Sequence, residues 1–139
     1  MRKRSYKTQK LYAWKAFSKY IRLRDSNSYG IGECISCKRK THWKEMQAGH
    51  LISGRCNNIL FDEELVYLQC ARCNNNSGEQ AKMWINLKEK FGWDDNKFDE
   101  FNARKNKILK FSQAELANIE EHYIDMVVGE SIKKGVIDG

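Results

Sequence analysis

The sequence of 139 residues contains no proline and no apolar run long enough to cross a membrane. The absence of proline favours uninterrupted helices, because proline removes a backbone donor and clashes with the preceding helical turn. A membrane-spanning helix needs about 20 mainly apolar residues. The basic start, residues 1–4, is also not followed by the apolar core of a signal peptide. We therefore expect neither membrane insertion nor secretion, and a cytoplasmic location.

Acidic residues are scarce in the first part of the chain. Residues 1–55 carry 14 Lys and Arg against 3 Asp and Glu, whereas residues 56–139 carry 11 against 15. Residues 1–24 alone hold nine basic residues and no acidic one. A basic arm of this kind indicates a polyanionic partner, with nucleic acid as the leading candidate. The alternative is a solvated tail that only improves solubility.

Four of the five cysteines form two matched pairs, Cys34 with Cys37 and Cys70 with Cys73. Two thiolates at this spacing on a tight turn can bind one ion, and two such turns complete a tetrahedral zinc site. Disulfides are disfavoured in a reducing compartment, and two copies of the motif argue against a single redox dithiol. The sequence therefore favours structural Zn²⁺ at these four residues, and it leaves Cys56 as a spare thiol.

Periodicity predicts helices on both sides of two short strands. Apolar residues three or four apart predict an amphipathic helix over residues 8–25, and strand-forming residues predict strands over 45–52 and 65–69. Further helices are expected over three segments: from near the second cysteine pair or from Ser77 to Gly92, over residues 96–110, and from Ser112 onward. Ser77 with Gln80, and Ser112 with Glu115, match the capping-box pattern.

These elements predict an α+β protein with three parts. Residues 1–26 are expected to form a basic N-terminal arm and helix. Residues 27–92 would form a core that zinc holds together, and residues 93–139 a C-terminal helical extension. The two predicted strands and the cysteine pairs all fall in the central part. The chemistry is therefore expected there.

His50 lies in the first predicted strand, and Asn74 directly follows Cys73. A zinc-stapled hairpin that leads into a helix can hold an imidazole opposite the first helical turn. Phosphodiester hydrolysis needs a base to activate water and a divalent cation to stabilise the leaving oxygen. Zinc bound by four thiolates has no open position, so the catalytic ion would be a separate one. The alternatives are a histidine that only forms internal hydrogen bonds and an asparagine that caps the helix.

A set of short motifs runs from the first helix past the second cysteine pair. It consists of Ala16-Phe17 to Arg24-Asp25, Cys34-Ile-Ser-Cys37, Ala48-Gly49-His50, Phe61-Asp62-Glu63, Gln69-Cys70 with Cys73-Asn74, and Ser77-Gly78. Over residues 14–92 this set resembles the NinG (Rap) recombination endonucleases of lambdoid phages. The Cys-Asn end of the second pair is also similar to phage endonuclease VII, a junction resolvase of the HNH, or His-Me finger, class. The resemblance implies a zinc-stabilised ββα-metal core that cuts branched recombination intermediates, such as Holliday junctions or D-loops, in the cytoplasm of a bacterial host.

The resemblance also implies roles for individual residues. His50 takes the position of the general base, and Asn74 that of a residue binding catalytic Mg²⁺ or Mn²⁺. The family pattern has an aspartate where this chain has Gln47, so the anionic ligand of the ion stays open. Asp62 or Glu63 could supply it, or Gln47 and Asn74 could hold the ion together with a substrate phosphate.

Basic side chains are expected to contact DNA phosphates without reading sequence. We assign this role to Arg2, Lys3, Arg4, Lys7, Lys15, Lys19, Arg22 and Arg55. Two other functions stay open: a zinc-dependent DNA-binding module without catalysis, as Gln47 would suggest, and a site-specific restriction or homing nuclease. Two symmetric cuts in a junction would suit a homodimer. The tryptophans could stack on unpaired bases, although helical spacing favours core positions for Trp14 and Trp84.

Overall fold

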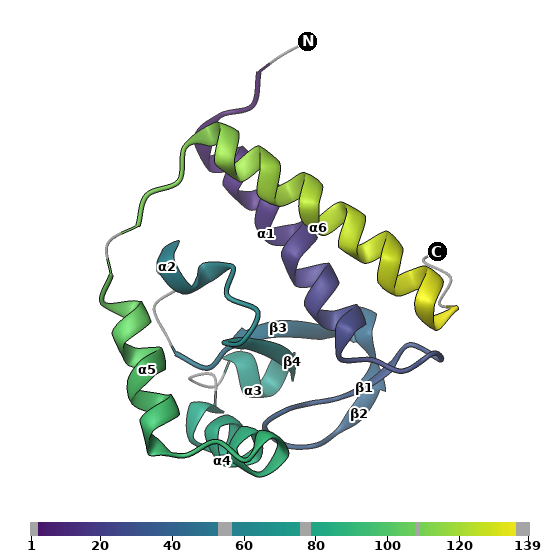
Figure 1. Cartoon of the computed structure of the whole chain (residues 1–139). Coiled ribbons are helices and arrows are strands. Elements are labelled where there is room, and N and C mark those ends of the chain that lie inside the picture. The colour runs from purple at the N-terminus through teal and green to yellow at the C-terminus, as the bar shows by residue number, and fades with distance from the viewer. Residues whose placement is uncertain (1–2, 53–56, 76–78, 108, 136–139) are drawn as a thin grey trace.

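The computed structural model describes residues 3–52, 57–75, 79–107 and 109–135 (Figure 1). Its elements, in chain order, are α1 (Tyr6–Arg24), β1 (Ile31–Glu33), β2 (Lys40–His42), the 3-10 helix η1 (Trp43–Glu45), β3 (Met46–His50), α2 (Asn57–Leu60), β4 (Val66–Cys70), α3 (Ala71–Asn75), α4 (Gln80–Phe91), α5 (Asp95–Lys105) and α6 (Gln113–Lys134). The predicted α+β class is confirmed.

The described strands form two small antiparallel sheets. In the first, β1 pairs with β2, so that Ile31 lies opposite His42. In the second, β3 pairs with β4, so that Gln47 lies opposite Gln69 and His50 opposite Val66. The predicted strands 45–52 and 65–69 correspond to β3 and β4. The β1–β2 hairpin was not predicted, because three-residue strands are too short to show alternation.

The helices begin and end where local chemistry favours it. The capping box at Ser112 is confirmed, since Ser112 and Glu115 exchange side-chain and backbone hydrogen bonds at the start of α6. Gly92 ends α4 in the left-handed conformation, at a φ of 69°. Of the two predicted starts, the one at Ser77 was wrong, because Glu79 is the N-cap residue of α4. A separate short helix, α3, begins directly after Cys70. Ser77 itself lies outside the described residues.

The first and last helices, α1 and α6, lie side by side above the β3–β4 sheet (Figure 1). Aromatic rings join them: the ring of Phe17 meets that of Tyr123 edge to face, with centroids 4.9 Å apart. Tyr20 and Val66 belong to the same buried cluster, which therefore joins both helices to the sheet. Helices α4 and α5 lie on the other side of β3–β4 (Figure 1).

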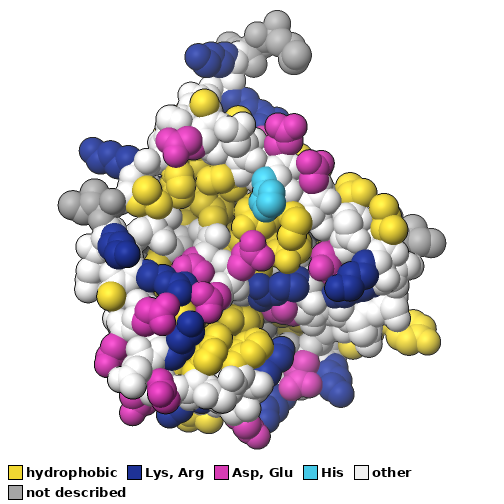
Figure 2. Space-filling model, in the orientation of Figure 1, with side chains coloured by type: hydrophobic (Ala, Val, Ile, Leu, Met, Phe, Trp, Pro, Cys, Tyr) yellow, Lys and Arg dark blue, Asp and Glu magenta, His cyan; other side chains and the backbone are white. Residues whose placement is uncertain are grey.

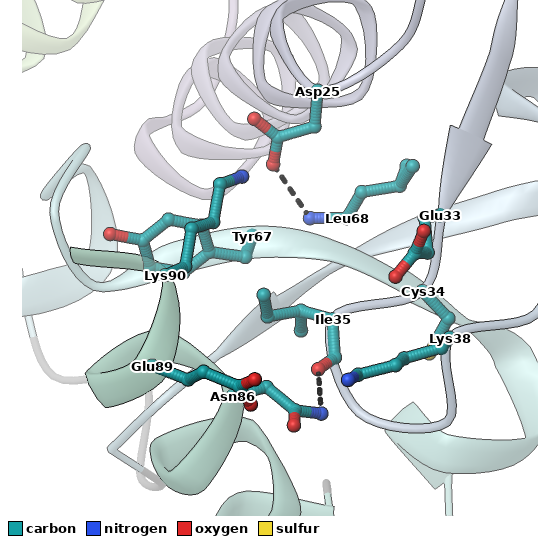
Figure 3. Close-up of a pocket in the computed structure, with 10 residues that line it drawn as sticks. All are labelled: Asp25, Glu33, Cys34, Ile35, Lys38, Tyr67, Leu68, Asn86, Glu89 and Lys90. Carbon is teal, nitrogen blue, oxygen red and sulfur yellow. Dashed lines mark hydrogen bonds between the residues drawn. The ribbon is translucent and has the colours of Figure 1, made fainter. Parts of the chain in front are cut away.

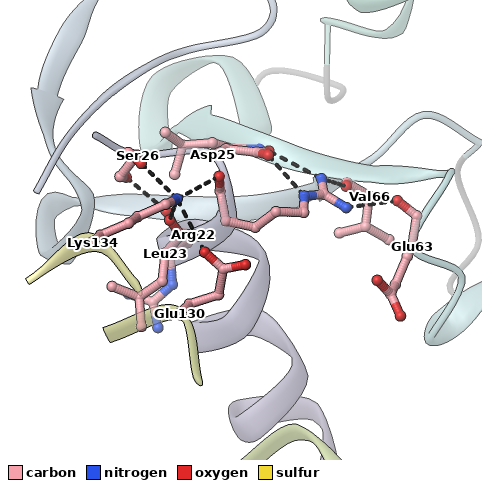
Figure 4. A network of polar contacts seen from close by, with 10 residues as sticks. Arg22, Leu23, Asp25, Ser26, Glu63, Val66, Glu130 and Lys134 are labelled. Carbon is pink, nitrogen blue, oxygen red and sulfur yellow. Dashed lines mark hydrogen bonds and ion pairs between the residues drawn. The ribbon is translucent and has the colours of Figure 1, made fainter. Parts of the chain in front are cut away.

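Lysine 134 ties the end of α6 to the end of α1 (Figure 4). Its ammonium group donates to the backbone carbonyls of Leu23, Arg24 and Ser26 at 2.5, 2.8 and 2.7 Å. Glu130 forms an ion pair with the same ammonium at 3.3 Å. These carbonyls are at the C-terminal end of α1, where intrahelical partners run out and a positive charge is favoured.

Replacing Lys134 with methionine should lower the free energy of unfolding by about 1.5–3 kcal/mol, the usual contribution of hydrogen bonds to a charged group. Urea denaturation measures this loss. Lys133 is the matched control, because it is the adjacent lysine and is exposed. A Lys133→Met variant should stay within about 0.5 kcal/mol of the wild type. Equal losses in the two variants would contradict the assigned role.

Arg24 and Asp25 connect α1 to β4 in the same region (Figure 4). The Arg24 guanidinium donates to the carbonyls of Glu63 and Val66, each at 2.8 Å, and pairs with the Asp25 carboxylate at 2.8 Å. Asp25 in turn accepts the backbone N–H of Leu68 at 3.0 Å. The outer edge of β4 is therefore covered by these side chains, and α1 has a fixed position relative to the β3–β4 sheet.

The face shown in Figure 2 carries an apolar hollow between α2 and α6. It has a volume of about 690 Å³, and its apolar lining is Phe61, Leu109, Phe111, Ile119 and Tyr123. Asp62, Glu63 and Glu64 also line it. None of the described helices combines the length and apolar composition that a membrane span requires.

Candidate functional site

The thiols of Cys34, Cys37, Cys70 and Cys73 converge on one point. All four sulfur atoms lie within 4.8 Å of one another, and those of Cys37 and Cys70 are 3.8 Å apart. In a tetrahedral zinc site with Zn–S bonds of about 2.3 Å, the sulfur atoms are about 3.8 Å apart. The four cysteines are therefore positioned to hold a metal ion, and their spacing is compatible with structural zinc.

The first cysteine pair sits on the loop of the β1–β2 hairpin. The N–H of Cys34 donates to the carbonyl of Arg39, and Lys38 turns the chain with a φ of 65°. Figure 3 shows how this loop is held from α4: the amide of Asn86 donates to the carbonyl of Ile35 at 2.7 Å. These hydrogen bonds fix the conformation of the loop that carries Cys34 and Cys37.

The second pair spans the junction of β4 and α3. Cys70 is the last residue of β4, and Cys73 lies one helical turn later, inside α3. Met46 and Leu68 complete a small buried cluster with three of the cysteines. This apolar shell limits the access of water to the four thiols. An ion bound there would therefore be shielded from solvent.

The thiols differ in their protonation behaviour. Burial raises the pKa of Cys34, and it also raises the pKa of Cys73, to about 12. Burial acts in the same direction on Cys37, but the N–H of Arg39 and the neighbouring thiols outweigh it and lower the pKa of Cys37 to about 7. A bound cation would have to displace protons from the buried thiols, so metal affinity should fall as the pH falls.

His50 is buried at the end of β3, with 8% of its surface exposed. Its ring stacks on that of Trp14 from α1, with centroids 5.2 Å apart and planes inclined by 20°. Its Nε2 atom lies 3.2 Å from the carbonyl oxygen of Leu60. A carbonyl can only accept, so Nε2 carries the proton in a neutral ring and the lone pair is on Nδ1.

Gln47 and Asn74 are brought together, as the predicted metal site requires. The amide nitrogen of Asn74 donates to Oε1 of Gln47 at 2.6 Å. Gly49 allows this approach: a Cβ atom there would lie 1.9 Å from Oε1 of Gln69 and 3.2 Å from Oδ1 of Asn74. Asn74 lies inside α3 and does not cap a helix, so the capping alternative was wrong.

The imidazole and the amide pair lie on opposite faces of β3. Side chains alternate along a strand, and Gln47 and His50 are three residues apart. His50 meets Trp14 of α1, whereas Gln47 meets Asn74 of α3. Within the described part of the chain, β3 pairs only with β4, so its other edge carries no neighbouring strand.

Asp62 and Glu63 have partners other than Gln47 and Asn74. Asp62 forms an ion pair with Arg104 at 3.0 Å, and Glu63 accepts the hydroxyl of Tyr123 at 3.0 Å. Burial and the Glu63 charge raise the pKa of Tyr123, which keeps its phenol protonated. Among the described residues, the four cysteines are the only group of His, Cys, Asp or Glu that converges to hold a metal. A role for Glu63 as a metal ligand stays a prediction.

Basic side chains gather along the exposed side of α1. Lys19, Arg22 and Lys44 all lie over the ring of Trp43, at 6.0, 5.1 and 5.7 Å from its centroid. Lys15 lies over Tyr12, at 5.5 Å. Lys15, Lys19 and Arg22 are among the residues predicted to contact DNA, and Lys44 lies beside them over Trp43. A role for these side chains in DNA binding stays a prediction.

The remaining basic residues predicted to bind DNA differ in their surroundings. Lys3 and Lys7 are exposed. Arg4 forms an ion pair with Glu120 of α6 at 2.6 Å, so it also anchors the N-terminal segment. Arg2 and Arg55 lie outside the described residues.

The family model of the bacteriophage lambda NinG protein matches residues 1–129. The chain belongs to the NinG family. This family is related to phage recombination, and the match covers α1, both sheets, the four-cysteine cluster and most of α6. The comparisons with curated proteins and with solved structures gave no match.

Proposed function

We propose that this NinG-family protein is a metal-dependent endonuclease that cuts branched DNA, such as Holliday junctions or D-loops. The observation that supports this best is the meeting of Gln47 with Asn74 beside Gly49, on the strand that ends at His50. A strand pair followed directly by a helix, with a base on the strand and oxygen ligands at the helix, is the arrangement of a ββα-metal nuclease. The four cysteines would hold structural zinc and so fix β4 and α3 in place.

His50 would act as the general base. Because Leu60 accepts from Nε2, the Nδ1 lone pair is the one that can take a proton from the attacking water. Stacking on Trp14 holds the ring in one orientation, which matters because proton transfer depends on hydrogen-bond geometry. The water would then attack phosphorus in line with the leaving oxygen.

Asn74 and Gln47 would hold the catalytic ion through amide oxygens. The donor set fits a hard cation, since carbonyl-type oxygens bind Mg²⁺ and Mn²⁺ together with water and phosphate. Bound there, the ion would stabilise negative charge on the leaving oxygen. The cations along α1 would hold phosphates further along the DNA. A pair of cuts across a junction would come from two copies of the chain.

Cleavage of a four-way junction and of a linear duplex with the same sequences tests this proposal. We expect nicks in the junction that need added Mg²⁺ or Mn²⁺ and few nicks in the duplex. Binding without any metal-dependent cleavage would instead support a zinc-dependent DNA-binding module. Cutting of the linear duplex at one sequence would instead support a site-specific nuclease.

A change of Gln47 to aspartate should lower the concentration of Mg²⁺ needed for half-maximal cleavage. The reason is that a hard cation gains an anionic oxygen in place of a neutral one. Gln47→Glu keeps the length of the side chain and the acceptor for Asn74, so it serves as the second variant. A metal titration of cleavage rates measures the effect. An unchanged requirement in both variants would show that position 47 does not face the ion.

A further inference from the structure

A pocket of about 510 Å³ lies next to His50, between the first half of α1 and the end of α2. Its lining residues are Lys7, Thr8, Lys10, Leu11, Trp14 and Leu60. Two of them also contact His50: Trp14 through its ring, and Leu60 through its carbonyl oxygen. Whatever occupies the pocket therefore lies beside the group that we propose as the base.

The lining combines an apolar floor with a basic rim. Leu11, Trp14 and Leu60 supply the apolar surface, and 48% of Leu11 is exposed to solvent. Lys7 is exposed, and Lys10 is held at the rim because its ammonium donates to Asn57 of α2 at 2.7 Å. Among the described residues that line the pocket, none is acidic. Such a surface suits a flat apolar group that carries negative charge at its edge.

We propose that this pocket binds an unstacked nucleobase, with the adjoining phosphates on Lys7 and Lys10. The inference rests on the proposed endonuclease function, because it explains how such an enzyme would select its substrate. In a continuous duplex each base is stacked and paired, whereas branch points and single strands offer unstacked bases. Stacking on an aromatic ring tolerates any base, so the selection would follow DNA structure and not sequence. A base held here would also place its neighbouring phosphate near His50.

The test is equilibrium binding of an oligothymidylate and of a duplex of equal length, without Mg²⁺ or Mn²⁺, across a salt series. Leu11→Ser removes apolar surface without adding charge. Ile124→Ser is the matched control, because Ile124 lies on α6 and is 49% exposed. We expect Leu11→Ser to weaken oligothymidylate binding about 5- to 100-fold, because the bound base loses the apolar contact that the leucine side chain supplies. Duplex binding and both salt slopes should stay unchanged. Lys7→Ala should instead lower the single-strand slope by about 0.7.

A second measurement follows stacking of the base by fluorescence. An oligothymidylate with one 2-aminopurine should lose fluorescence when it binds the wild-type protein, since stacking quenches this base, and Leu11→Ser should restore the emission. The proposal would be overturned by equal affinities of Leu11→Ser and Ile124→Ser for oligothymidylate, by equal losses on duplex and single strand, or by unquenched emission. These readouts do not involve cleavage. A protein that binds in this way but never cuts would refute the endonuclease function and leave the pocket assignment intact.

Discussion

A Cys70→Ser variant should fail to bind zinc and should be largely unfolded at room temperature. Zinc contributes about 10–16 kcal/mol to the folding of small zinc domains, which equals or exceeds the whole stability of a typical domain. In this chain the cluster joins the β1–β2 hairpin to the junction of β4 and α3. Losing one thiolate would therefore leave three ligands for the ion and expose buried thiols at this junction. Elemental analysis and circular dichroism measure the two effects.

Cys56 provides the matched control for this substitution. It is the cysteine outside both pairs, and a Cys56→Ser variant should keep about one zinc per chain and its melting temperature. Removal of zinc from the wild type with a chelator should reproduce the unfolding, more readily at low pH because protons compete for the thiolates. A zinc-free protein that melts at the same temperature as the untreated protein would refute a structural metal at this cluster.

Replacement of His50 with alanine should reduce the rate of junction cleavage by about a hundred- to ten-thousand-fold, the usual effect of losing a general base. Junction affinity should stay within about threefold of the wild type, because the basic side chains that we propose to hold most of the phosphates are unchanged and binding free energy would change by less than about 1 kcal/mol. Single-turnover kinetics and a binding isotherm in the absence of Mg²⁺ and Mn²⁺ separate the two quantities.

The buried position of His50 makes a second variant necessary. In His50→Gln, an amide can still donate to Leu60 but has no nitrogen that accepts a proton at neutral pH. This variant should fold with nearly the wild-type melting temperature and cleave as slowly as His50→Ala. If either folded variant cuts the junction at the wild-type rate, His50 is not the base.

Local patterns in the sequence were sufficient to predict most elements of the fold. The 3.6-residue period placed α1, α4, α5 and α6 within a few residues. The paired spacing of the cysteines also indicated that they converge. Each of these signals lies within a short segment, so no knowledge of tertiary packing was needed.

The contacts that build the site could not be predicted in this way. The stacking of His50 on Trp14 and the hydrogen bond to Leu60 join segments far apart in the sequence. The same holds for Lys134, which lies near the end of the chain and donates to a backbone carbonyl at the C-terminal end of α1. Helical spacing placed Trp14 in the core, whereas it is half-buried and also lines the pocket next to His50. Periodicity identifies the buried side of a helix but not what packs there.

The most direct test of the proposed nuclease site is a crystal structure of the protein with a four-way junction and Mn²⁺, with anomalous maps at the zinc and manganese edges. We expect a zinc peak among the sulfur atoms of Cys34, Cys37, Cys70 and Cys73. We expect a manganese peak within about 2.5 Å of an amide oxygen of Asn74, with a DNA phosphate between it and His50. A complex in which manganese is absent from Asn74, or in which the nearest phosphates lie far from His50, would contradict the proposed nuclease site.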